Sequence, residues 1–387
     1  MSVASARLSA KAWRFSRLLA FRTLEDGRRF SGAYSKMSTN PESIPKTQRA
    51  ACYDKPNDPI KIRDIPVPEP GDDDLLVKVL FSGVCHTDLH VWQGDLPGVD
   101  RKPNVGGHEG AGIVVKVGRN VSSFKVGDRA GIKWINGTCL SCSECRQGWE
   151  PNCPKAVVSG LHRNGSFQQY ALVKATEAST IPEKADLAHA APILCAGVTV
   201  FKALKEAHLT AGEIVAITGA SGGLGSFAIQ YAKAMGYRVL AIDQKGSEEH
   251  CRELGAEWFV DFNNKDLVQQ VMSLTDGGPH AVLDIAPAQQ SIETSVQYVR
   301  TRGTVVVIAL PKGVKLNADV TDLVLRALTV KGSYVGTRHD TDQAMDFFAR
   351  GLIEVPVKII PLSELATVYQ AMIDKKISGR FVVDLWK

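Results

Sequence analysis

The cysteines carry the strongest chemical signal in this sequence. Four of the eight fall within fifteen residues, at Cys139, Cys142, Cys145 and Cys153. Thiolates are preferred zinc ligands, and four of them at this spacing predict a tetrahedral site with no position open for a reactant. A loop this short buries little apolar surface, so a zinc ion would supply much of its folding energy. The alternative is a cluster of reactive or simply buried thiols.

A second set of metal-ligating residues is scattered along the chain. It comprises Cys85, His108 with the adjacent Glu109, and Cys195. Two thiolates and one imidazole leave a fourth position on a zinc ion open, which is a catalytic arrangement. Spacing alone does not separate this interpretation from a structural one, because buried cysteines and isolated histidines are common in protein cores.

A glycine-rich turn predicts a dinucleotide-binding site. Residues 219–225 read Gly-Ala-Ser-Gly-Gly-Leu-Gly, which differs from the strict G-x-G-x-x-G pattern by one residue inserted early. The turn follows an apolar run at 214–217 and precedes a helical pattern at 227–235. Its backbone could approach a pyrophosphate whose charge meets the N-terminus of the helix. The residues expected to do so are Gly219, Gly222, Gly223, Leu224 and Gly225.

An acid closes the next predicted strand, 239–242. Asp243 could accept hydrogen bonds from an adenosine ribose and would repel a 2′-phosphate, so the sequence favours NAD over NADP. The alternative is a solvated turn residue at the end of a strand.

The secondary-structure elements that must position these residues follow two different sequence patterns. From Ala51 to about Val173, short apolar runs such as 75–80 and 112–117 are separated by Gly, Pro and Asp, which predicts strands and turns. From about Gly212, strands at 214–217, 239–242, 281–285 and 304–308 alternate with helical patterns, which predicts a parallel, doubly wound sheet. The expected fold class is therefore α/β, with a Rossmann coenzyme domain and a mainly β catalytic domain.

Length and composition agree with two domains. A chain of 387 residues exceeds what one core usually serves, and 44% hydrophobic content without a long apolar run argues against a membrane span. We expect a catalytic domain over 47–195 to which 337–387 returns, and an NAD-binding domain over 196–336.

The formal net charge of +5 is concentrated in residues 1–36, which hold eight basic and two acidic side chains. The rest of the chain is nearly neutral, so we expect no nucleic-acid partner. The segment is rich in Arg, Ser and Ala, which is typical of a mitochondrial transit peptide and predicts the mitochondrial matrix. Met37 offers an alternative start that would leave a cytoplasmic form, and an ordinary disordered tail is the other interpretation.

Several motifs together resemble one family. The segments Gly-Val-Cys85-His86-Thr87-Asp88-Leu89-His90, Gly-His108-Glu109-Gly-Ala-Gly and Cys195-Ala-Gly, the four-cysteine loop and the ending Gly379-Arg380-Phe-Val-Val-Asp are similar to zinc-containing medium-chain alcohol dehydrogenases of the yeast type. The similarity runs from about Thr47 to the C-terminus.

The resemblance implies roles for these residues. Its catalytic domain would be GroES-like, with a catalytic zinc held by Cys85, His108 and Cys195 and a structural zinc held by the four-cysteine loop. Glu109 would lie beside the metal, and Asp88 would orient the ligating histidine. The remaining cofactor contacts would come from His86, Lys245, Ile308 and Arg380, although the loop that carries Lys245 is one residue shorter than is usual in the family. A homotetramer is also implied.

The implied activity is oxidation of primary alcohols, with secondary, longer-chain or aromatic alcohols as further candidate substrates, together with the reverse reduction, by hydride transfer with NAD. Thr87 would receive the alcohol proton and pass it towards His90 for release. Trp134 retains one tryptophan of the family's pocket, whereas Leu96 replaces a second, which should widen it. Two rival functions are a zinc-free quinone or enone reductase of the same superfamily and a non-catalytic nucleotide-binding protein.

Overall fold

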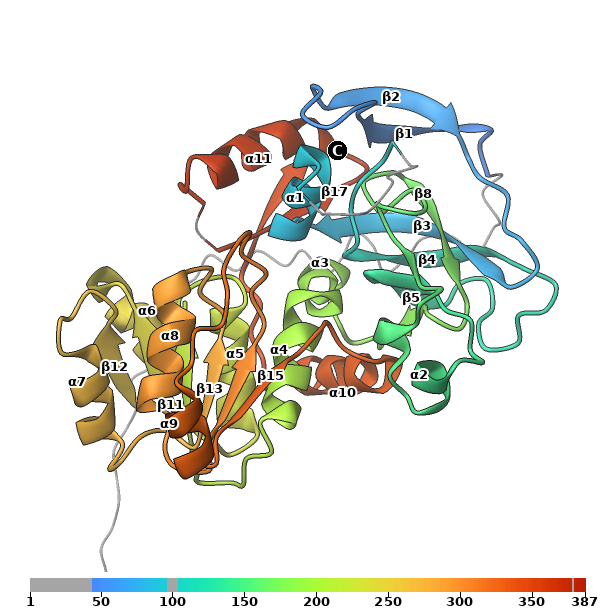
Figure 1. Ribbon diagram of the computed structural model, residues 1–387. Coiled ribbons are helices and arrows are strands. Elements are labelled where there is room, and N and C mark those ends of the chain that lie inside the picture. The colour runs from blue at the N-terminus through green and yellow to red at the C-terminus, as the bar shows by residue number, and fades with distance from the viewer. Residues whose placement is uncertain (1–43, 96–103, 378) are drawn as a thin grey trace, which may run out of the picture. The chain divides into compact units, whose positions relative to one another are not determined.

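The computed structural model describes residues 44–95, 104–377 and 379–387. Leu96 and the basic segment 1–36 therefore lie outside the described residues. The described chain contains two large sheets, each of which includes strands that the sequence pattern indicates (Figure 1).

The parallel sheet has six strands in the order β12-β11-β10-β13-β14-β15. In chain order this is 3-2-1-4-5-6, the order of a dinucleotide-binding fold, and it confirms the predicted fold class. The strands are β10 (Ile214–Thr218), β11 (Arg238–Asp243), β12 (Trp258–Asp261), β13 (Ala281–Asp284), β14 (Thr304–Val307) and β15 (Thr329–Gly332). Its helices are α5 (Gly225–Ala234), α6 (Glu248–Leu254), α7 (Leu267–Leu274), α8 (Gln289–Tyr298) and α9 (Val320–Leu325).

Both faces of this sheet are buried, which explains why its strands are apolar throughout. On β10, Val215 and Ile217 belong to one hydrophobic core, and Ile214 and Ala216 belong to another on the opposite face. Side chains alternate between the two faces of a strand, so a continuous apolar run is what a sheet covered on both sides requires.

The second sheet has seven strands and is largely antiparallel. Its order is β16-β17-β3-β4-β5-β9, with β8 also pairing to β3. The strands are β3 (Asp74–Gly83), β4 (Gly110–Val117), β5 (Arg129–Ile132), β8 (Tyr170–Lys174), β9 (Ser179–Thr180), β16 (Val357–Pro361) and β17 (Arg380–Asp384). Because β17 pairs with β3, the C-terminal segment joins strands almost three hundred residues earlier in the chain.

Shorter elements complete the described chain. Two-stranded sheets are formed by β1 (Thr47–Cys52) with β2 (Lys61–Pro66), and by β6 (Ile135–Gly137) with β7 (Val157–Val158). The remaining α-helices are α1 (His86–Gln93), α2 (Ser143–Arg146), α3 (Leu187–Ala190), α4 (Ala196–Glu206), α10 (Arg338–Ala349) and α11 (Leu365–Ile373).

The segment that links the two sheets is a core element. Leu194 and Val198 pack in the same buried cluster as Val215 of the parallel sheet and Leu80 of the antiparallel sheet. Among the described residues no single helix is long and apolar enough to span a membrane; only the bent pair Leu187–Leu194 and Ala196–Glu206 reaches that length and composition.

Candidate functional site

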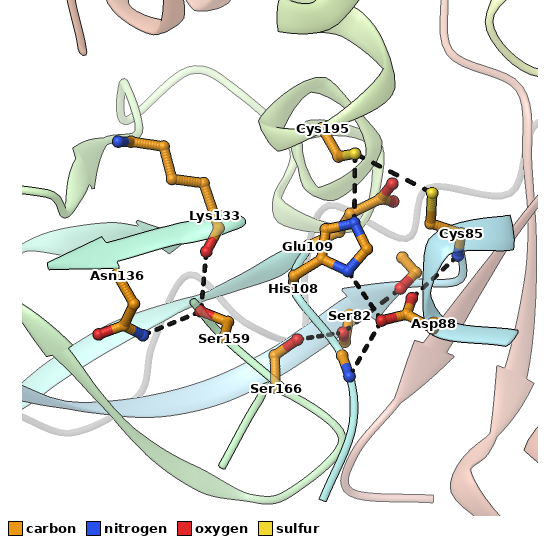
Figure 2. Close-up of polar contacts among 12 residues, drawn as sticks. Ser82, Cys85, Asp88, His108, Glu109, Lys133, Asn136, Ser159, Ser166 and Cys195 are labelled. Carbon is orange, nitrogen blue, oxygen red and sulfur yellow. Dashed lines mark hydrogen bonds and ion pairs between the residues drawn. The ribbon is translucent and has the colours of Figure 1, made fainter. Parts of the chain in front are cut away.

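Three separate segments deliver the scattered metal-ligating residues to one place. Cys85 follows β3 and is the N-cap of α1, His108 and Glu109 directly precede β4, and Cys195 is the N-cap of α4. Figure 2 shows Cys85, His108 and Cys195 pointing towards one another. The ligating residues therefore lie at or beside the ends of helices and strands, and not within them.

The donor atoms of this cluster are close enough to share one ion. The ligand atoms of Cys85, His108, Glu109 and Cys195 all lie within 4.8 Å of one another, and all four residues are buried. The two sulfur atoms are 4.0 Å apart, and His108 Nε2 lies 3.2 Å from Cys195 Sγ. Hydrogen bonds from Cys195 and then His108 hold the pKa of Cys85 well below its ordinary value, so a thiolate is favoured. Two sulfurs and one imidazole fit zinc.

Asp88 ties two of these segments together. Its Oδ1 lies 2.7 Å from His108 Nδ1 and accepts the backbone N–H of Gly107 at 3.1 Å. Its Oδ2 accepts the backbone N–H of Cys85 at 3.1 Å, which also caps α1. With Nδ1 bonded to the carboxylate, His108 presents Nε2 to the cluster, as a ligating histidine must.

Glu109 is fixed by an ion pair and by a glycine. Arg380 of β17 donates to Glu109 Oε2 at 2.6 Å, and burial raises the pKa of Glu109 to about 7 despite this cation. A Cβ atom on Gly83 would lie 1.9 Å from Oε2, so the carboxylate occupies space that only glycine leaves free. No local pattern predicts this need, because Gly83 lies within a strand and has no positive φ.

Of the expected proton-path and pocket residues, Leu96 lies outside the described residues, and the others lie on α1 or beside His108. Thr87 and His90 lie on α1, where His90 is exposed and its Nδ1 lies 3.4 Å from Asp95 Oδ2. His86 is the first residue of the same helix and is also exposed. Trp134 is buried, and its ring meets that of His108 edge-on with centroids 5.1 Å apart.

The four-cysteine loop forms a second donor set. The sulfur atoms of Cys139, Cys142, Cys145 and Cys153 lie within 4.8 Å of one another, and all are free thiols. Backbone N–H groups donate to three of the sulfurs, among them Cys142 N to Cys139 Sγ at 3.3 Å. Hydrogen bonds from Ser141 and Cys142 lower the pKa of Cys139 to about 5. Four sulfurs at this separation fit a tetrahedral zinc ion, with no donor position left over.

The glycine-rich turn lies where the strand order reverses, between the carboxyl ends of β10 and β13. Gly219 has φ of +64°, and a Cβ on it would lie 3.5 Å from the backbone nitrogen of Ala286. A Cβ on Gly225 would lie 2.2 Å from the carbonyl oxygen of Gly219, so the turn closes tightly onto the first residue of α5. This edge is where parallel sheets of this type bind ligands.

Arg380 connects the two sites. A Cβ on Gly223 would lie 3.1 Å from Arg380 Cδ, while the guanidinium of the same residue pairs with Glu109. A cation thus lies beside both the predicted pyrophosphate turn and the metal-ligating cluster.

Other predicted cofactor residues are placed as follows. Asp243 ends β11, and its two oxygens accept the backbone N–H groups of Ser221 and Gln244, each at 2.7 Å. Ile308 is buried just after β14. Lys245 is mostly exposed, with its ammonium 2.5 Å from Glu248, and no described contact brings it to Asp243.

Sequence reasoning missed Tyr334. It follows β15, and its hydroxyl oxygen accepts the indole N–H of Trp134 at 2.6 Å. The flanking residues Gly332 and Gly336 are the only local signal of a close approach in this segment.

Two family models match the chain. Residues 71–183 match "Alcohol dehydrogenase GroES-like domain" and residues 223–350 match "Zinc-binding dehydrogenase". The chain is 51% identical over 342 residues to Alcohol dehydrogenase 1 of Caenorhabditis elegans, covering 88% of this chain and 98% of the relative.

Solved structures with the same architecture include an acetophenone reductase and a cinnamyl alcohol dehydrogenase. Acetophenone reductase of Geotrichum candidum, in complex with NAD, is 30% identical with a TM-score of 0.77, covering 89% of this chain and 98% of that one. A cinnamyl alcohol dehydrogenase of Sorghum bicolor is 28% identical with a TM-score of 0.80, covering 88% and 98%.

Proposed function

The chain belongs to the zinc-containing medium-chain alcohol dehydrogenases, and from this premise we propose that it oxidises small primary alcohols to aldehydes and catalyses the reverse reduction. It is an oxidoreductase whose cofactors are zinc and NAD. The observation that carries the proposal is the convergence of Cys85, His108 and Cys195 within one buried cluster beside Arg380.

Each residue of the cluster has a separate task. Cys85, His108 and Cys195 would hold zinc, which as a Lewis acid activates an alcohol oxygen, while NAD accepts the hydride. Asp88 fixes the tautomer and orientation of His108 through the 2.7 Å contact to Nδ1. Arg380 balances the buried charge of Glu109 and offers a cation to the cofactor phosphates. The four sulfurs of the loop would hold a second, structural zinc.

The proton of the alcohol must leave a buried site. Thr87 and His90 lie on the first helix after Cys85, and His90 reaches solvent. We assign Thr87 as the first acceptor, which passes on its own hydroxyl proton, and His90, whose imidazole reaches solvent, as the group that releases the proton.

Zinc content and turnover test the function together. The purified enzyme should contain two zinc ions per chain and form NADH from ethanol. A zinc-free quinone or enone reductase would contain no metal and would reduce its substrate without it, and a non-catalytic protein would bind NAD without turnover. Either result would refute the proposal.

Substrate range is assigned to Trp134 and Leu96. We assign Trp134 as one wall beside His108, and a leucine at position 96, where the family resemblance implies tryptophan, would leave room for chains longer than ethanol. Each additional methylene that the pocket accepts is worth about 0.8 kcal/mol of binding. Leu96→Trp should therefore shift kcat/KM from hexanol towards ethanol. An unchanged ratio would remove Leu96 from the pocket.

A homotetramer is proposed, with contacts between copies at one edge of the parallel sheet. β15 is one of its two edge strands, and the neighbouring helix α9 exposes Val320, Val324 and Leu325, each by more than two thirds. An edge strand beside an apolar surface is a common place for two copies of a chain to associate.

The mitochondrial matrix is proposed as the location of the chain that begins at Met1, and the cytoplasm for one that begins at Met37. The support is compositional: eight basic and two acidic residues within 1–36. A fluorescent protein fused to residues 1–45 should enter mitochondria, whereas a diffuse cytosolic signal would refute the assignment.

A further inference from the structure

The indole of Trp134 is held on two sides. One edge meets the ring of His108 with an interplanar angle of 75°. On another side the indole N–H donates to the hydroxyl oxygen of Tyr334 at 2.6 Å. Trp134 itself is only 8% exposed. A buried indole N–H without an acceptor is costly, so this hydrogen bond favours one orientation of the ring.

Tyr334 belongs to the segment that follows β15 of the parallel sheet. It lies on the crossover from β15 to α10, two hundred residues from Trp134 in the chain. The contact therefore joins the segment after the parallel sheet to the segment after β5, beside the metal-ligating cluster.

The crossover is held in an unusual backbone conformation. Val335 has φ of +41°, which a β-branched residue rarely adopts, and its side chain packs in the hydrophobic cluster that contains Trp134. Next to it, a Cβ on Gly336 would lie 2.2 Å from Val198. Backbone strain persists where the surroundings determine the conformation, and it is often found at functional sites.

We propose that Tyr334 is a positioning residue for substrate selection: its hydroxyl fixes the indole of Trp134 against His108, so that the crossover between the two sheets sets the shape of the alcohol site. The inference rests on the proposed function, because it takes Trp134 to be a wall of that site. Tyr334 acts through Trp134 and does not itself take part in hydride or proton transfer.

Tyr334→Phe removes the acceptor and little else. The indole of Trp134 is then no longer held in one orientation, so the alcohol site should accept bulky alcohols more readily. We expect kcat/KM for isobutanol or benzyl alcohol, relative to ethanol, to rise about three- to tenfold, the effect of one hydrogen bond between neutral groups. The change should appear mainly in KM, because wall contacts bind substrate and transition state alike.

Tyr231→Phe is the matched control. Tyr231 is buried in the core on one side of the parallel sheet, and its hydroxyl donates to the carbonyl oxygen of Ala344 at 3.0 Å. Its removal likewise costs one hydrogen bond of a tyrosine hydroxyl, in a different hydrophobic cluster from that of Trp134. A similar change in the substrate ratio in this variant would overturn the proposal, because general loosening would then explain the effect.

A double-mutant cycle with Trp134→Phe separates the inference from the function it rests on. Phenylalanine has no N–H to donate, so Tyr334→Phe should not change the ratio further in that background. If Trp134→Phe alone left the ratio unchanged, the assigned wall would fail, and the inference with it. If Trp134→Phe changed the ratio and Tyr334→Phe did not, the inference alone would fail.

A spectroscopic measurement gives a result independent of turnover. In protein with isotopically labelled tryptophan, the Trp134 indole N–H resonance is identified by its loss in Trp134→Phe. Tyr334→Phe should shift this resonance and speed its exchange with solvent, and Tyr231→Phe should not. An unmoved resonance with unchanged exchange would overturn the proposal.

Discussion

At the scale of single residues, the site depends on side chains that serve two neighbours at once. Asp88 binds His108 Nδ1 with one oxygen and the backbone N–H of Cys85 with the other. Arg380 pairs with Glu109 and lies against Gly223 of the nucleotide turn. Such residues couple the metal cluster to its surroundings, so replacing one of them should affect more than one function.

Asp243 provides a prediction at this scale. Asp243→Asn keeps a side-chain oxygen for one of the two backbone N–H groups that the carboxylate accepts, and it removes the negative charge. The ratio of kcat/KM for NADP to that for NAD should rise about tenfold, or about 1.4 kcal/mol, the scale of repulsion between two nearby charges at a protein surface.

Asp261→Asn is the control for that experiment. Asp261 ends the neighbouring strand β12 and likewise accepts a backbone N–H, from Asn263 at 2.9 Å. It should leave the cofactor ratio unchanged. An unchanged ratio in Asp243→Asn would remove Asp243 from the ribose site.

At the scale of elements, the four-cysteine loop is docked onto a helix that begins almost two hundred residues later. Glu150, 2% exposed, lies within the loop, and its Oε1 accepts the backbone N–H of Arg338 at the N-terminus of α10. The ammonium of Lys202 on α4 lies 4.5 Å from the ring centroid of Trp149. The loop therefore does more than enclose its own donor atoms, because it supports the two helices that follow the sheets.

Glu150→Gln tests this docking. The amide keeps the shape of the side chain but loses the charge that meets the N-terminus of α10 and Arg338, which should cost about 1–3 kcal/mol of local stability. Hydrogen exchange at the first turn of α10 should accelerate accordingly. Glu144→Gln, in the same loop but partly exposed, should leave that turn protected. Equal protection in both variants would contradict the docking role.

At the scale of the whole molecule, local patterns predicted more than long-range contacts. The apolar runs 214–217 and 239–242, the turn 219–225 and the cysteine spacing each depend on neighbouring residues, and each predicted element is present. The pairs Trp134 with Tyr334, Glu150 with Arg338 and Glu109 with Arg380 join residues about two hundred or more positions apart. These pairs depend on how the two sheets pack together, and a local sequence pattern does not predict that packing.

A substitution on helix α9 tests whether copies of the chain associate through this helix. Leu325→Asp places a charge on the proposed contact surface and should reduce the molar mass of the enzyme measured by light scattering. Val126→Asp, at another exposed apolar position, should leave it unchanged. If neither variant changed the mass, copies would not associate through α9.

We infer that two disjoint sets of ligands hold two zinc ions, and that only the set containing Cys195 serves catalysis. Metal analysis of purified Cys195→Ala protein, together with its rate of NADH formation from ethanol, tests this most directly. We expect a folded protein that keeps one zinc ion per chain and has lost turnover. Two zinc ions per chain with normal turnover would contradict it.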